Sequence, residues 1–194
     1  MKKSLILATL LAAAPFAASA GELNYNYVEA GYANVDVERH DGKGFQLRGS
    51  VAVDENFYLF GGYASATNDD FGLDIDLTET QLGLGYRHGL NDRADLIAEV
   101  GYLRHELDVK GYGSESLSGA RVSVGFRGKL ADNFEGWVKG SYNDGGDFEG
   151  SFSALAGAQL NLTQTWGVVA EVENGEIVDD ADTTKYLIGV RASF

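Results

Sequence analysis

The chain has 194 residues, a formal net charge of −14, a single proline and no cysteine. This length suits one domain, and the absence of cysteine excludes disulfide staples and thiol chemistry. The excess of acidic residues argues against a nucleic-acid partner, because contacts to phosphate need lysine and arginine.

The N-terminus has the features of a secretory signal peptide. Two lysines are followed by the apolar stretch Leu5–Phe16 and by the small residues Ala18–Ala20, which is the usual order of the charged, apolar and cleavage regions. A membrane-anchoring helix is the alternative, but a helix that spans a bilayer usually needs about 20 apolar residues. We therefore expect residues 1–20 to be removed and residues 21–194 to form the mature domain.

Apolar side chains then recur at every second position in ten segments. This period of two is the signature of a strand with one apolar and one polar face. The expected strands are residues 24–35, 44–53, 57–67, 78–87, 95–106, 119–127, 135–142, 152–160, 166–173 and 186–194. Small residues blur the pattern in the seventh and eighth segments. A count of eight strands, with two of the segments as loop, is the alternative.

The connections between these segments alternate in length. Four are tight, namely residues 54–56, 89–93, 129–133 and 161–165. Five are longer and acidic, namely residues 38–43, 68–76, 107–118, 143–150 and 174–183. Short periplasmic turns and longer extracellular loops are typical of outer-membrane barrels, and with this count both chain ends lie on the periplasmic side.

The chain ends on an apolar strand face, in Tyr186–Phe194. An exposed apolar edge strand invites aggregation in water, whereas a barrel in lipid needs an apolar outer face and a last strand that pairs with its first. A water-soluble barrel would place its apolar face inward, and the signal peptide and the terminal Phe194 favour the membrane. The sequence thus predicts an all-β fold, an antiparallel transmembrane β-barrel of ten strands in the bacterial outer membrane. Tyr186 and Phe194 would form the assembly signal.

Several segments resemble a known family. Asn24–Tyr32, Asn56–Tyr63, Gly157–Gln159 and Asn161–Gly167 are similar to segments of small outer-membrane proteins of Gram-negative bacteria that are described as regulated by a diffusible signal factor. The resemblance covers essentially the whole chain, signal peptide included. It implies a small porin-like outer-membrane barrel and supplies no catalytic motif. Since a fold alone does not fix a function, the activity has to be sought in individual residues.

Charged residues fall on the face opposite the apolar one, which in a membrane barrel lines the lumen. The inward basic residues are Arg48, Arg87, Arg121, Arg127, Lys139, Lys185 and Arg191, and the inward acidic residues are Glu29, Glu99, Glu171 and Glu173. Charges in a narrow interior must be paired or hydrated, and ten strands are close to the size at which side chains fill a barrel. We therefore favour a lumen largely plugged by paired charges and a structural or surface-interaction role. A small porin-like channel for ions or small solutes is the alternative.

The acidic loops raise the question of a metal site. Asp144, Asp147 and Glu149 are a weak calcium candidate, because hard cations favour carboxylate oxygens. The segment lacks the full spacing of the helix-flanked calcium loop, and a solvated acidic surface that prevents association is the favoured interpretation. We expect no cofactor.

The histidines raise the question of an enzyme. His40, Asp41, His105 and Glu106 could meet at the extracellular rim, with a histidine as general base. No spacing among them matches a specific catalytic motif, so a rim hydrolase is a distant alternative and we do not expect an enzyme.

Aromatic residues are expected at both membrane boundaries. Those near the periplasmic boundary or at strand ends are Tyr27, Trp166, Tyr186 and Phe194, and those toward the extracellular ends are Tyr32, Tyr63, Tyr102 and Tyr142. The expected partners are outer-membrane lipid, lipopolysaccharide and the outer-membrane assembly machinery, for a chain that is monomeric.

Overall fold

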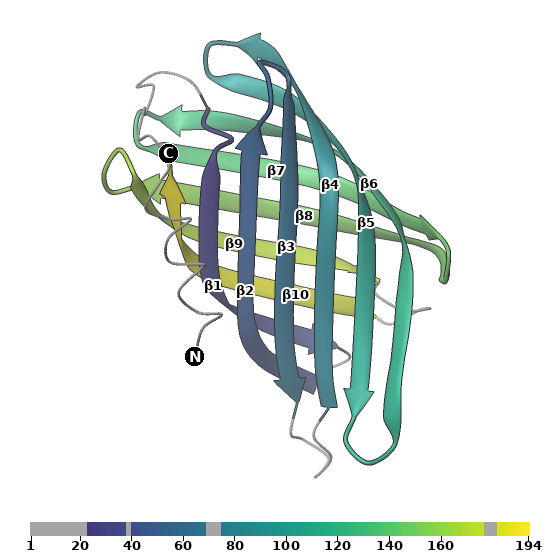
Figure 1. Ribbon diagram of the computed structural model, residues 1–194. Coiled ribbons are helices and arrows are strands. Elements are labelled where there is room, and N and C mark those ends of the chain that lie inside the picture. Colours follow the sequence, from purple (N-terminus) through teal and green to yellow (C-terminus); the bar gives the residue numbers. More distant parts are fainter. Residues whose placement is uncertain (1–22, 38–39, 69–74, 177–181) are drawn as a thin grey trace, which may run out of the picture.

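Ten strands form a closed antiparallel barrel in the part of the chain that the computed structural model describes, residues 23–37, 40–68, 75–176 and 182–194. The strands are β1 (Tyr27–Val37), β2 (His40–Ala52), β3 (Phe57–Asn68), β4 (Ile75–Asn91), β5 (Ala94–Val109), β6 (Gly113–Ala131), β7 (Phe134–Gly145), β8 (Phe148–Asn161), β9 (Trp166–Glu176) and β10 (Asp182–Ser193). Each strand pairs with the next along the chain, and β1 pairs with β10 (Figure 1). The prediction of ten strands is confirmed, and the alternative of eight is wrong. The signal peptide expected at residues 1–20 lies outside the described residues.

The barrel is apolar outside and charged inside. Phe152 and Leu82 point outward with 71% and 66% of their surface exposed, whereas Arg191 on the inner face is 4% exposed. An apolar wall on a sheet that closes on itself suits contact with lipid. A water-soluble barrel would instead have an apolar core, so that alternative is excluded. Within the described ranges, no helix is long and apolar enough to cross a membrane.

The two ends of the barrel differ in their connections. Four short turns, residues 53–56, 92–93, 132–133 and 162–165, lie at one end together with the C-terminus. Outer-membrane barrels have their short turns on the periplasmic side, so we call this the periplasmic end. It lies at the top of Figure 1, where the C-terminus is marked.

A series of backbone hydrogen bonds runs around the periplasmic end, and we call it the rim. In each of the four short turns, the carbonyl of the last residue accepts a hydrogen bond from a backbone N–H at the same end of the next strand but one. The N-terminal segment supplies a fifth acceptor. The acceptor and donor residues are Asn56 with Arg87, Arg93 with Lys129, Asn133 with Asn161, Thr165 with Ser193 and Asn26 with Phe194, at 2.7–3.1 Å. The side chain of Asn24 also donates to the carbonyl of Phe194 at 3.1 Å. Both ends of the barrel segment therefore take part in the rim.

Three connections that were expected to be long loops are mostly strand. The first is residues 38–43, of which His40 and the residues after it belong to β2. β5 and β6 continue until they join at residues 110–112, and β7 and β8 join at residues 146–147. Gly111 and Gly113 turn the first hairpin with φ angles of 90° and 112°, values that favour glycine. This hairpin reaches beyond the barrel wall at the bottom of Figure 1.

The chemistry of the two faces changes where β5 and β6 pass the extracellular end of the lipid-facing wall. Outward residues are apolar up to Tyr102, but the next outward residues, Arg104 and Glu106, are charged. The inward Leu103 is apolar and fully buried. On β6, the outward residues before Ala120 are the polar Ser114, Ser116 and Ser118, because the outer face here leaves lipid for water. A search for one continuous apolar face therefore begins this strand too late, at residue 119 in place of 113.

Candidate functional site

Side-chain chemistry concentrates in the interior of the barrel. Among the described residues, seven basic and seven acidic side chains form ion pairs there, and we call them the lumen charges. The basic members are Arg48, Arg87, Arg121, Arg127, Lys139, Lys185 and Arg191, and the acidic members are Glu29, Glu79, Asp95, Glu99, Glu135, Glu171 and Glu173. All seven basic residues were expected on the inner face, whereas Glu79, Asp95 and Glu135 were not among the expected inward residues. Each of the three shares the parity of an inward neighbour on its own strand, so the signal was present in the alternation.

A middle layer of lumen charges centres on Glu29. This carboxylate accepts hydrogen bonds from Arg48 of β2 and from Arg191 of β10, the latter with Nη2 to Oε2 at 2.7 Å. Arg48 also reaches across the lumen to Glu171 of β9, with Nη1 to Oε2 at 2.7 Å. The indole Nε1 of Trp137 donates to the other oxygen of Glu171 at 2.8 Å. One connected network thus joins five strands, β1, β2, β7, β9 and β10, and crosses the interior.

Glu99 forms a second bridge in the same layer. Its carboxylate accepts a hydrogen bond from the hydroxyl of Tyr58 at 2.8 Å and from Nζ of Lys139 at 3.0 Å. These residues lie on β3, β5 and β7, so neither partner is on a strand that pairs with that of Glu99. Contacts between unpaired strands require side chains that meet inside the barrel.

An extracellular layer contains Glu79, Lys185 and His105. Glu79 of β4 pairs with Lys185 of β10 and contacts Nε2 of His105 at 3.1 Å. In the same layer, Arg121 of β6 faces Glu173 of β9 at 3.6 Å. His105 lies directly opposite Glu79 on the neighbouring β5, whereas the pairs Glu79–Lys185 and Arg121–Glu173 join strands that are not neighbours in the sheet.

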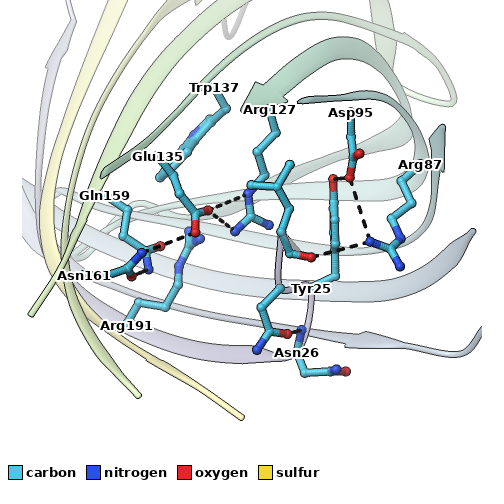
Figure 2. A network of polar contacts seen from close by, with 12 residues as sticks. Tyr25, Asn26, Arg87, Asp95, Arg127, Glu135, Trp137, Gln159, Asn161 and Arg191 are labelled. Atoms are coloured by element: carbon cyan, nitrogen blue, oxygen red, sulfur yellow. Dashed lines mark hydrogen bonds and ion pairs between the residues drawn. The ribbon is translucent and has the colours of Figure 1, made fainter. Parts of the chain in front are cut away.

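A periplasmic layer is built around Tyr25, which precedes β1 (Figure 2). Its hydroxyl donates to Asp95 at 2.9 Å, and the guanidinium groups of Arg87 and Arg127 lie 5.0 and 4.8 Å from its ring centre. Arg127 in turn pairs with Glu135 at 2.7 Å. Burial raises the pKa of the Tyr25 hydroxyl well above its usual value, so it stays a hydrogen-bond donor. The segment before β1 therefore enters the periplasmic mouth. This corrects the expectation that the first strand begins at residue 24, since β1 begins at Tyr27.

Little space remains between these layers. A cavity of about 50 Å³ touches Arg48 and Lys185. Another of about 50 Å³ lies closer to the periplasmic end, beside Tyr25 and Lys139. A cavity of this size holds only a few water molecules. The described interior is thus charged and paired, and these two cavities within it are small.

Two of the three residues considered for a calcium site, Asp144 and Asp147, form hydrogen bonds within the protein. One oxygen of Asp147 accepts hydrogen bonds from the backbone N–H and the hydroxyl of Ser118, at 2.9 and 3.2 Å. Asp144 bonds to the N–H of Gly145, and the side chain of Glu149 lies outside the described residues. In the described part of the chain, no group of three or more histidine, cysteine or acidic residues is placed to hold a metal ion.

The residues considered for a hydrolase site at the extracellular end do not all come together. His105 is buried on the inner face, whereas the neighbouring Glu106 is paired with Arg104 on the exposed outer face. Adjacent residues of a strand point to opposite sides, so His105 and Glu106 cannot converge. The side chains of His40 and Asp41 lie outside the described residues.

Two aromatic residues occupy other positions than expected. Tyr27 faces the lumen, where the guanidinium of Arg191 lies 3.9 Å from its ring centre, so it is not part of a lipid-facing girdle. Tyr186 pairs with Asn34 and lies closer to the extracellular end than Tyr32, which pairs with Ile188. Tyr186 therefore belongs with the extracellular aromatic residues and lies at the opposite end of β10 from Phe194.

Glycines make room for the large rings inside the lumen, and this gives a testable consequence. A Cβ atom at Gly157 would lie 2.4 Å from Nε1 of Trp137. We expect Gly157→Ala to displace this indole from Glu171 and to lower the free energy of unfolding by about 1–3 kcal/mol, measured by urea unfolding in lipid vesicles with circular dichroism. Gly140→Ala on the adjacent strand is the control, because nothing lies within 4 Å of a Cβ atom there. Equal losses in the two variants would contradict the role given to Gly157.

The closed sheet, the lipid-compatible wall and the charged interior define a transmembrane β-barrel of the bacterial outer membrane. In agreement, the family described as "Outer membrane protein beta-barrel domain" matches residues 4–194, and the chain belongs to this family. The protein is therefore a bacterial outer-membrane protein. No curated protein matches the chain.

Several solved structures are similar to this chain. The translocator domain of the autotransporter NalP from Neisseria meningitidis has 11% sequence identity and a TM-score of 0.50, over 98% of this chain and 96% of that one. Ail, the attachment invasion locus protein of Yersinia pestis, has 17% identity and a TM-score of 0.47, over 87% and 97%. OprG from Pseudomonas aeruginosa has 12% identity and a TM-score of 0.45, over 90% and 98%. At these levels of identity the similarity concerns the fold alone.

Proposed function

We propose that this barrel is a structural or surface-interaction protein of the outer membrane and that its lumen is closed to solutes. The observation that carries the proposal is the pairing of the lumen charges. Seven basic residues meet seven acidic residues in three layers, and many of the contacts cross between strands that are not neighbours. A passing solute would have to break these pairs, and breaking a buried pair typically costs about 3–5 kcal/mol.

The periplasmic mouth supports the same proposal. Leu23 and Tyr25 are both buried and pack with Tyr58 and Ile97. Tyr25 also contacts Asp95. Leu23 and Tyr25 therefore fill the mouth on the periplasmic side of the middle layer, and we call these two residues the stopper.

Single-channel conductance in a planar bilayer tests this function. We expect almost no current through the wild-type barrel. Tyr25→Ala, which removes the stopper, and Glu99→Ala, which releases Lys139 and Tyr58, should each raise the conductance. Glu55→Ala is the control, because Glu55 is an exposed acidic residue on a periplasmic turn, and it should leave the current unchanged. A wild-type conductance typical of open porins would overturn the proposal and favour the porin-like channel.

We extend the proposal to the expected partners. The barrel is a monomer that interacts with outer-membrane lipid and lipopolysaccharide and is inserted by the assembly machinery that reads its last strand. We also propose that it belongs with the small barrels regulated by a diffusible signal factor, on the basis of the segment resemblance. We assign no catalytic role, and the opposite orientations of His105 and Glu106 support this choice.

A further inference from the structure

The four periplasmic turns share an apolar residue at the same position. A valine or leucine either opens the turn, as at residues 53 and 162, or lies two residues before it at the end of the strand, as at residues 90 and 130. The residues that follow it up to the next strand are polar apart from one alanine at position 131. The four residues are Val53, Leu90, Leu130 and Leu162, and we call them the apolar turn residues. In every turn the residue two positions further on is acidic or amide-bearing, namely Glu55, Asp92, Asp132 and Gln164.

These side chains are large and exposed. Val53, Leu90, Leu130 and Leu162 expose 55%, 51%, 69% and 63% of their surface. Leu130 lies against the outer wall, because a Cβ atom at the outward Gly136 would be 3.0 Å from its Cδ1 atom. Val53 continues the outward series of β2 directly after Val51, which is also exposed. The apolar turn residues therefore continue the lipid-facing wall at its periplasmic edge.

Two different turn geometries place these residues in the same position. In the β2–β3 and β8–β9 turns, the N–H of Val53 donates to Phe57 and that of Leu162 donates to Trp166, at 2.9 and 2.8 Å. The β4–β5 and β6–β7 turns instead contain a register shift, next to Leu90 and next to Leu130. An apolar residue at this position is thus not a requirement of one turn type. It is a property of the whole periplasmic edge.

We propose that the apolar turn residues form a ring of membrane anchors in the periplasmic, phospholipid leaflet of the outer membrane. Their continuity with the lipid-facing wall identifies lipid as the occupant. The ring lies at the boundary between acyl chains and headgroups, at the level where interfacial aromatic residues such as Trp166 are found in membrane proteins. The polar residues two positions further on lie in the headgroup region or in water. The ring thereby sets how deeply the barrel sits in the bilayer.

The absence of cysteine from the chain makes this inference directly testable. Val53→Cys, Leu90→Cys, Leu130→Cys and Leu162→Cys variants are labelled with a nitroxide in phospholipid vesicles. The matched controls are Glu55→Cys, Asp92→Cys, Asp132→Cys and Gln164→Cys. Collision of the nitroxide with oxygen, which concentrates in lipid, is compared with collision with a water-soluble nickel complex.

We expect the oxygen-to-nickel ratio to be several-fold higher at each apolar turn position than at its control two residues away. Equal ratios within each pair would show that the turns stand in water and would overturn the proposal. Protection of the apolar positions from both reagents would show contact with protein in place of lipid and would overturn it as well.

The native Trp166 offers a second measurement that needs no substitution. Trp166 closes the turn that begins at Leu162 and is exposed on the outer wall, whereas Trp137 is buried in the lumen. Phospholipids brominated near the headgroup should therefore quench Trp166 more than phospholipids brominated near the end of the acyl chain. The reverse order would place this turn near the bilayer centre and would overturn the proposed height of the ring.

Discussion

Glu29→Ala is expected to lower the free energy of unfolding by about 3–5 kcal/mol, the usual cost of removing one member of a buried ion pair. Glu29 is 4% exposed and accepts hydrogen bonds from both Arg48 and Arg191. Its removal leaves a buried guanidinium, that of Arg191, without its carboxylate, while Arg48 keeps its contact with Glu171. Urea unfolding in lipid vesicles, followed by circular dichroism, gives the measurement.

Two further variants separate charge from shape. Adding Arg191→Met to Glu29→Ala removes the uncompensated cation, so the double variant should recover part of the lost stability. Glu55→Ala, which removes an exposed carboxylate outside the lumen, should change the stability by less than about 0.5 kcal/mol. A double variant that loses the sum of both single losses would show that Glu29 and Arg191 act independently.

Val124→Arg is expected to lower stability by about 2–4 kcal/mol, because a charged side chain then faces the acyl chains near the middle of the bilayer. Val124 lies on the outer face of β6, about midway between the outward Ala120 and Leu130, and 53% of it is exposed. The loss is measured by the same unfolding experiment.

The same strand provides the control for this substitution. Ser116 is exposed on the part of β6 that extends beyond the aromatic residues at the extracellular boundary. Ser116→Arg introduces the same charge into water and should be nearly neutral. Similar losses at the two positions would mean that the membrane boundary on β6 has been placed wrongly.

The alternation of residues predicts much of this barrel, because each strand obeys one simple constraint. In β2, Phe45 and Leu47 face lipid while Arg48 faces the lumen, as the period of two requires. The same rule also points Glu79 inward, since it shares the parity of Gln81 within the expected strand 78–87, although Glu79 was not among the expected inward residues.

The partners of the lumen charges could not be predicted. Whether Arg48 meets Glu171 or Glu173 depends on the stagger of the strands around the barrel, and alternation carries no information about stagger. The stopper was also missed, because Tyr25 fits the alternation of the first strand as well as it fits a segment that turns into the mouth. Its contacts with Asp95 and Arg127 arise from strands that are far away in the sequence.

The rim of backbone hydrogen bonds has a consequence for how the barrel is completed. Its hydrogen bonds follow one another around the periplasmic end, and they encircle the barrel only after the last of them has formed. The chain is made from its N-terminus, so the carbonyl of Asn26 is present long before the N–H of Phe194 that bonds to it. The hydrogen bond from the N–H of Phe194 to the carbonyl of Asn26 is therefore the one that completes the rim. A barrel that lacks it is incomplete at one place, the seam between the first and last strands.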